Sequence, residues 1–164
     1  MRKITLAGPL ILAAMAAAGA PTAGAANTPR CTTADLAGAI IDEDAGAGNR
    51  FARLILTNTS THDCHTKGFI GGQLIDADGA EIATHIVRSS KKPKTVLVRA
   101  GAAASARLHW TVVPSGKETS CPTAPTLAVT PPDETTTLPV YFGGTACGGR
   151  IDVDPLRSAR PIGN

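Results

Sequence analysis

The chain has few aromatic residues: three Phe, one Trp and one Tyr among 164 residues. A core with so few rings must rely on Leu, Ile, Val and Ala, which bury less apolar area per residue. The sequence also lacks phosphate-binding, dinucleotide-binding and serine-hydrolase fingerprints, and it has no pair of cysteines at C-x-x-C spacing. We therefore predict no catalytic, cofactor-binding or metal-binding residue, and we expect the protein not to be an enzyme.

Net charge is nearly absent outside the N-terminal segment. The formal net charge of +3 includes Arg2 and Lys3, and the chain beyond residue 25 carries 14 basic against 13 acidic residues. Such a balance gives no general electrostatic attraction to nucleic acid or to an anionic membrane. We expect no nucleic-acid partner.

Long hydrophobic runs are missing as well, except at the N-terminus. Two basic residues precede an Ala/Leu/Ile-rich run over residues 4–20, and a small-x-small pattern follows at residues 23–25. This order is typical of a secretory signal peptide. The run is mostly Ala, it is interrupted by Gly8 and Pro9, and it falls short of the roughly 20 strongly apolar residues of a spanning helix. Retention as a membrane anchor is the less favoured alternative.

The cleavage site follows from the residues around the end of this run. Cleavage after Ala20 would place Pro21 at the next position, which disfavours it, so we predict cleavage after Ala25 and a mature chain that begins at Ala26. A lipoprotein needs a Leu-Ala-Gly-like triplet before its cysteine, whereas Thr-Pro-Arg precedes Cys31. We therefore predict a signal peptide over residues 1–25 and a secreted protein that is not a lipoprotein, with no stable membrane insertion.

Short strand-like segments separated by turn signals fill the mature chain, a pattern that predicts an all-β sandwich. Residues 105–113 alternate apolar and polar side chains with a period of two, as a half-buried strand requires. The sequence predicts a β-sandwich domain over residues 26–156 and a flexible C-terminal tail over residues 157–164. Residues 42–49, polar and rich in glycine, are expected to form a loop. The other strands are expected at residues 36–41, 51–57, 73–75, 80–88, 95–98, 126–130, 138–142 and 150–153.

Four cysteines in an exported chain indicate two disulfides. Cys31 precedes the first predicted strand and Cys64 follows the second, so antiparallel pairing of these strands would bring the two cysteines together. Cys121 and Cys147 bracket a predicted hairpin that turns at the prolines 131 and 132 in the same way. We therefore predict Cys31–Cys64 and Cys121–Cys147.

Residues 62–65, His-Asp-Cys-His, gather side chains that could serve as metal ligands. Oxidation of Cys64 would remove its thiolate, so a disulfide-pinned polar loop is favoured over a metal site. If the protein were instead a cell-wall-active hydrolase with loop-borne residues, His62, Asp63 and His65 would be the first candidates.

Two other features are open to a functional interpretation. A carbohydrate-binding module would need an exposed ring, for which Tyr141 or Phe142 is the best candidate. Lys91, Lys92 and Lys94, interrupted by Pro93, form a basic cluster that could touch anionic wall polymers, although a solvated loop is favoured.

Several pieces recur in order between the four cysteines, and they carry a family resemblance. They include Leu-Ile-Leu-Thr-Asn-Thr at residues 54–59, Asp-Ala-Asp-Gly at 76–79 and Leu-Ala-Val-Thr-Pro-Pro at 127–132. Over roughly residues 31–155 the chain resembles the exported actinobacterial family of domains of unknown function numbered 4232. The resemblance implies an immunoglobulin-like β-sandwich at or outside the bacterial cell envelope, and it implies no activity.

The sequence therefore predicts a secreted, disulfide-stabilised β-sandwich that serves as a non-catalytic binding or structural module. Its partner is expected to be an envelope or extracellular protein or a glycan. The hydrolase and the carbohydrate-binding module remain alternatives.

Overall fold

The computed structural model describes residues 28–159, and the predicted signal peptide lies outside this range. The described chain is all-β, with two short 3-10 helices, η2 (Thr33–Asp35) and η3 (Cys147–Gly149). The strands are β1 (Leu36–Gly46), β2 (Asn49–Asn58), β3 (Cys64–Thr66), β4 (Gly71–Ile75), β5 (Glu81–Ile82), β6 (His85–Arg88), β7 (Val96–Val98), β8 (Ala103–Thr111), β9 (Thr123–Thr130), β10 (Leu138–Thr145), β11 (Arg150–Val153) and β12 (Arg157–Ala159).

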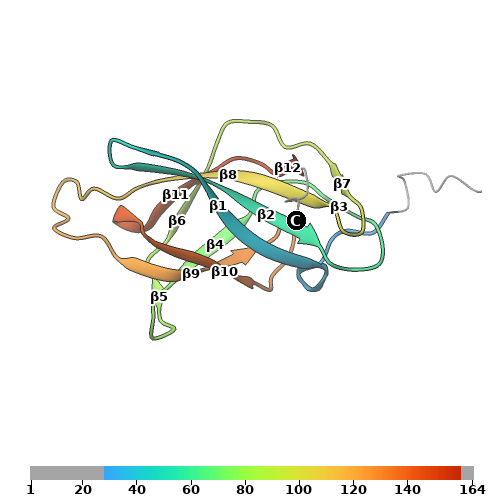
Figure 1. Ribbon diagram of the computed structural model, residues 1–164, viewed down its shortest axis with the longest axis horizontal. Helices are drawn as coiled ribbons and strands as arrows, with labels where there is room; N and C mark the ends of the chain where they lie inside the picture. Colours follow the sequence, from blue (N-terminus) through green and yellow to red (C-terminus); the bar gives the residue numbers. More distant parts are fainter. Residues whose placement is uncertain (1–27, 160–164) are drawn as a thin grey trace, which may run out of the picture.

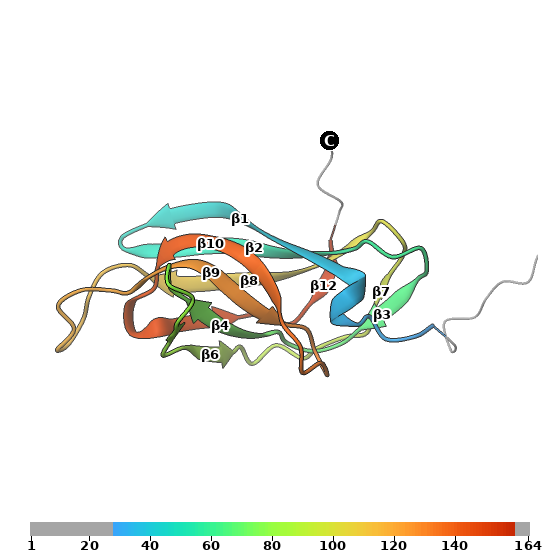
Figure 2. The same cartoon turned by 90° about the horizontal axis from the view of Figure 1, so that it is seen from below.

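Two sheets pack face to face as a β-sandwich (Figures 1 and 2). The larger sheet has the order β1-β2-β8-β11-β6, with β12 also paired to β8, and the smaller has the order β10-β9-β4-β5. Strands β3 and β7 form a separate two-stranded sheet at one end of the molecule. The named strands pair antiparallel except for β11 and β6, which are parallel. The prediction of an immunoglobulin-like antiparallel β-sandwich with two disulfides is confirmed, with this one parallel pair added.

The core lies between the sheets and follows the predicted alternation. On β8, Ala106, Leu108 and Trp110 are buried, whereas Arg107 and Thr111 are exposed and His109 is half-buried. The Trp110 ring meets the Phe142 ring of β10 at a centroid distance of 4.8 Å, which links the two sheets. The largest fully buried side chains are aliphatic: Leu54, Ile55, Leu56, Ile70, Leu74, Leu108, Leu127, Ile151 and Leu156, with Val98, Val129 and Val140.

Both predicted disulfides are present, Cys31–Cys64 and Cys121–Cys147. Cys64 begins β3 at one end of the sandwich, and Cys121 lies in the connection from β8 to β9, which projects from the opposite end (Figures 1 and 2). The two covalent links therefore hold opposite ends of the fold.

The predicted loop over residues 42–49 is wrong. Strand β1 continues to Gly46, and a two-residue turn at Ala47 and Gly48 joins it to β2. Both turn residues have positive φ, 47° and 78°, which is the dihedral pattern of the tight turns that match strand twist. The register of the β1–β2 pair shifts between Asp42 and Asp44, and β1 stays paired with β2 beyond this shift although its sequence there is polar.

Two further boundaries differ from the prediction. Residues 80–88 do not form one strand, because β5 belongs to the smaller sheet and β6 pairs with β11 in the larger one. The predicted flexible tail also needs correction, because its first residues, Arg157–Ala159, form β12 and pair antiparallel with β8. Its remaining residues, 160–164, lie outside the described range.

Candidate functional site

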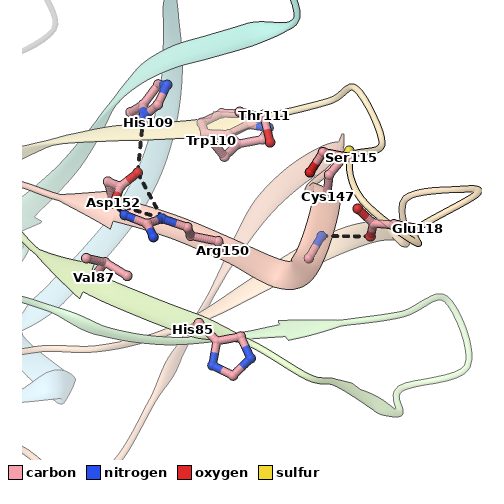
Figure 3. A pocket seen from close by; sticks show the side chains of 11 residues that line it. His85, Val87, His109, Trp110, Thr111, Ser115, Glu118, Cys147, Arg150 and Asp152 are labelled. Carbon is pink, nitrogen blue, oxygen red and sulfur yellow. Dashed lines mark hydrogen bonds and ion pairs between the residues drawn. The ribbon is translucent and has the colours of Figure 1, made fainter.

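A cleft of about 580 Å³ opens beside β6, β8, β11 and η3 (Figure 3). Its walls include His85, His109, Trp110, Glu118, Arg150 and Asp152. A shallower cleft of about 240 Å³ shares His109 and Asp152 and continues toward Phe51, Lys91 and Arg107. We call these two clefts together the outer groove, because they follow the solvent-facing side of the larger sheet.

Strand pairing places the polar residues of the outer groove in one row. His109 on β8 is in register with Phe51 on β2 and with Asp152 on β11. Because side chains alternate between the two faces of a sheet, the burial of Leu108 and Trp110 turns His109 outward, and the burial of Ile151 and Val153 does the same for Asp152. Adjacent strands thus bring an imidazole and a carboxylate together from residues 43 positions apart.

The Asp152 carboxylate is the centre of a hydrogen-bonded network. Arg150 donates to Oδ1 of this carboxylate through Nη2 at 2.6 Å and through Nε at 3.2 Å. The other carboxylate oxygen, Oδ2, lies 3.2 Å from His109 Nδ1. The hydrogen bonds from Arg150, assisted by that from His109, hold the pKa of Asp152 below its ordinary value against the opposing effect of burial. Figure 3 shows the three side chains side by side along the wall of the cleft.

The second ring nitrogen of His109 is occupied as well. Its Nε2 lies 2.8 Å from Asn49 Oδ1, and Asn49 in turn donates through Nδ2 to the Ala47 carbonyl. The imidazole also stacks on Phe51 with ring centroids 4.7 Å apart. An Asp–His pair in a catalytic triad leaves one nitrogen free for the nucleophile, and His109 has none free here. The network therefore holds the side chains of the groove in fixed orientations.

Trp110 contributes an unsatisfied donor to this region. The side chain is 4% exposed, and its Nε1 has no hydrogen-bond partner among the residues that the structure describes. It lies between the cleft of Figure 3 and a second cleft of about 470 Å³ that includes Arg50 and Phe142. Buried N–H groups without a partner are rare, and they commonly bind water or a ligand group.

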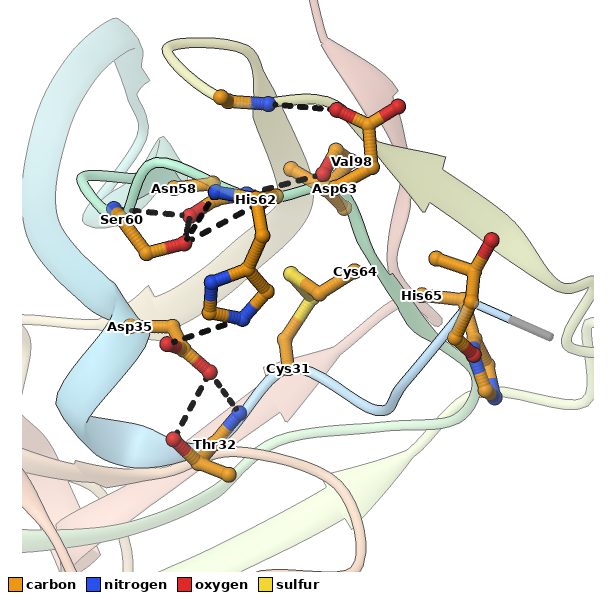
Figure 4. Close-up of a disulfide and its surroundings, with 12 residues drawn as sticks. Cys31, Thr32, Asp35, Asn58, Ser60, His62, Asp63, Cys64, His65 and Val98 are labelled. Atoms are coloured by element: carbon orange, nitrogen blue, oxygen red, sulfur yellow. Dashed lines mark hydrogen bonds and ion pairs between the residues drawn. A yellow bond between two sulfur atoms is a disulfide. The ribbon is translucent and has the colours of Figure 1, made fainter. Parts of the chain in front are cut away.

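The sequence-based hydrolase candidates do not come together. His62 Nε2 lies 3.6 Å from Asp35, whereas His65 Nδ1 lies 2.8 Å from the Thr28 carbonyl on the other side of the disulfide (Figure 4). Asp63 accepts a hydrogen bond from the Ala100 backbone N–H and so fixes a turn. Each of the three side chains contacts a different segment of the chain, and the three form no common site.

The sulfur atoms of all four cysteines take part in disulfide bonds. Cys64 is disulfide-bonded, so the metal-ligand interpretation of residues 62–65 loses its thiolate. Within residues 28–159, the acidic and sulfur ligands of Glu118, Cys121 and Cys147 do approach one another, but both sulfurs belong to the second disulfide. Glu118 instead accepts a hydrogen bond from the Gly148 N–H at 2.8 Å.

The two aromatic candidates for a carbohydrate-binding surface differ in their exposure to solvent. Phe142 is 8% exposed and packs on Trp110, so the expectation that it serves as a platform is wrong. Tyr141 is 79% exposed on the outer face of β10. Strands β4, β9 and β10 carry no charged residue, but the exposed Glu81 of β5 lies in the same cross-strand row as Tyr141.

None of His109, Arg150 and Asp152 stands out as a site residue in the sequence. Outward positions of Arg150 and Asp152 follow from the alternation of residues 150–153, and that signal was available in the sequence. The placement of β11 directly beside β8 is a long-range pairing that no local pattern reveals. The outer groove therefore emerges only from the assembled sheet.

Comparison with protein-family models matches residues 31–157 to the domain of unknown function DUF4232. Comparison with curated proteins and with solved structures finds no match.

Proposed function

We propose that this chain, which belongs to the DUF4232 family of domains of unknown function, is a secreted binding module that holds a polar envelope or extracellular ligand in the outer groove. The observation that carries the proposal is the Arg150–Asp152–His109 network along a cleft of about 580 Å³, in which Asn49 contacts the second ring nitrogen of His109 from outside the cleft lining. This volume lies within the roughly 300–1,000 Å³ of ordinary ligand sites.

The chemistry of the groove favours a ligand with little net charge. Arg150 and Asp152 neutralise each other while still offering unused donor and acceptor positions to a ligand. Side chains that are already held by hydrogen bonds lose little freedom when a ligand binds, which lowers the entropic cost of association. A glycan or a peptide segment of the envelope, rich in hydroxyl or amide groups, fits this surface.

The rest of the molecule supports a function outside the cytoplasm. Two disulfides indicate an oxidising compartment, and no helix within residues 28–159 is long and apolar enough to cross a membrane. The N-terminal signal-peptide pattern supplies the route of export. Intact mass measurement of protein recovered from culture medium tests this part: a chain that starts at Ala26 supports export, and a retained or lipid-bearing N-terminus contradicts it.

The binding site is tested with the mature protein on a glycan array and on immobilised peptidoglycan fragments. Arg150→Gln removes the guanidinium from the groove, and we expect it to weaken binding about tenfold or more. Arg99→Gln, which removes an equal charge from a turn away from the groove, is the matched control and should leave binding unchanged. Equal binding by both variants would rule the groove out.

A second candidate, carbohydrate binding on the smaller sheet, rests on the exposed ring of Tyr141. Exposed aromatic rings can stack against the apolar faces of sugars. On the same array, Tyr141→Ala should abolish such binding and Tyr141→Phe should retain it. Loss with Arg150→Gln alone favours the outer groove, and loss with Tyr141→Ala alone favours the smaller sheet.

A further inference from the structure

A separate small pocket lies between the loop that leads into β7 and the start of β12. It has a volume of about 270 Å³, and its basic side chains are Lys92, Lys94 and Arg157. Its residues do not overlap with those that line the cleft of Figure 3. We propose that this pocket is an anion-binding site that takes a phosphate group.

The fold assembles the pocket from two distant segments. Residues 92–95 precede β7, and Arg157 and Ser158 belong to β12, which pairs with β8 beside β7 (Figures 1 and 2). Val96 and Leu156 are buried, and they anchor the two segments in the core directly beside the pocket. The basic residues therefore project from a fixed base, and Lys92 and Lys94 are exposed.

The charged side chains that line the pocket are all basic. No carboxylate lines it, and Lys92 and Lys94 make no hydrogen bond or ion pair within residues 28–159. Lys91 is not part of the site, because its Nζ contacts Asp154 at 2.6 Å. Asp154 is the nearby acidic group that also attracts Arg157, but its carboxylate already holds Lys91.

The donor set suits a tetrahedral oxyanion. Two ammonium groups and a guanidinium supply positive charge, and the hydroxyls of Thr95 and Ser158 add neutral donors around the same pocket. A phosphate group offers several strong acceptor oxygens that can use such donors together, whereas a carboxylate offers only two oxygens. The pocket is slightly smaller than ordinary ligand sites, which fits one phosphate and a small substituent better than a large organic ligand.

Phosphate could reach this pocket as the free ion or as a phosphodiester within an extracellular polymer, and the two share the chemistry that the site recognises. The mature protein is titrated separately with inorganic phosphate and with a diglycerol phosphodiester while amide NMR shifts are followed. We expect saturable shifts at Thr95 and Ser158, weaker at high ionic strength because exposed charges are screened. The probe that binds more tightly identifies the source.

Lys92→Gln combined with Lys94→Gln should raise the phosphate Kd about tenfold. Arg99→Gln combined with Lys117→Gln removes the same charge from exposed positions outside the pocket and should leave the Kd unchanged. Absence of saturable shifts with both probes, equal weakening in the control pair, or equal binding of acetate would overturn the proposal. Because the proposed groove uses other residues, Arg150→Gln should not alter phosphate binding, so the two proposals fail independently.

Discussion

Gly149 shows how one residue fixes the approach to the outer groove. It has φ of 62°, and a Cβ at this position would lie 1.9 Å from the Ala83 carbonyl oxygen. The backbone that crosses from β5 in the smaller sheet to β6 in the larger one therefore passes directly over the end of η3. This close approach sets the position of Arg150, the next residue and the first of β11.

We predict that Gly149→Ala lowers the free energy of unfolding by more than about 3 kcal/mol, because the added methyl cannot fit unless the backbone moves. The adjacent Gly148 is a matched control, with φ of 61° and open space where its Cβ would lie. Gly148→Ala carries only the cost of the left-handed conformation, about 1–2 kcal/mol. Urea unfolding of both variants measures the difference, and equal losses would contradict the steric explanation.

At the level of elements, each disulfide joins an irregular segment of the chain to a short element. Cys31–Cys64 ties the segment before η2 to the three-residue strand β3, and Cys121–Cys147 ties the connection before β9 to η3. Their sequence separations are 33 and 26 residues, so the chain-entropy model assigns each link about 3–4 kcal/mol of stabilisation.

We expect replacement of either pair by alanine to lower the free energy of unfolding by about this amount, with the larger loss for Cys31 and Cys64. Both of these side chains are buried, so their removal adds a small cavity term, whereas Cys121 is only half-buried. Denaturant unfolding of the two double variants at one pH measures the order. A clearly larger loss for the second pair would contradict the burial argument.

The same elements show what local sequence could predict. Period-two alternation located β8, and the prolines at residues 131 and 132 marked the β9–β10 turn, because both signals depend on near neighbours. Three other features depend on long-range contacts. They are the continuation of β1 through a polar segment, the transfer of the chain from β5 to β6, and the pairing of β12 with β8. Both candidate sites depend on strand pairings of this kind, and only Lys91, Lys92 and Lys94 among their residues stand out in the sequence.

Across the whole molecule, acidic groups connect segments that lie far apart in the chain. Glu134, in the turn between β9 and β10, accepts from the Thr33 N–H and hydroxyl, and Arg30 pairs with Asp133 of the same turn. Lys91 pairs with Asp154 at the end of β11. These contacts join the N-terminal segment and the basic loop to the body of the sandwich.

This distribution predicts how stability depends on pH. Hydrogen bonds from Thr32 lower the pKa of Asp35, those from Thr33 lower the pKa of Glu134, and those from Arg150 lower the pKa of Asp152. For Asp154, burial opposes ionisation, but the hydrogen bond and charge of Lys91, with the charge of Arg157, lower its pKa. A carboxyl whose folded-state pKa is depressed stabilises the fold above its ordinary pKa, and this contribution is lost as the pH falls through the folded-state value.

The ordinary values are 3.8 for Asp and 4.5 for Glu, so the carboxyl contribution should be complete near neutral pH and should decline below about pH 4.5. Urea unfolding between pH 7 and pH 2 measures the decline in the free energy of unfolding. The variant that combines Asp35→Asn with Asp152→Asn removes two of these titrating groups, so it should be less stable at neutral pH and show a shallower decline in acid. An equally steep decline in this variant would place the acid sensitivity elsewhere in the molecule.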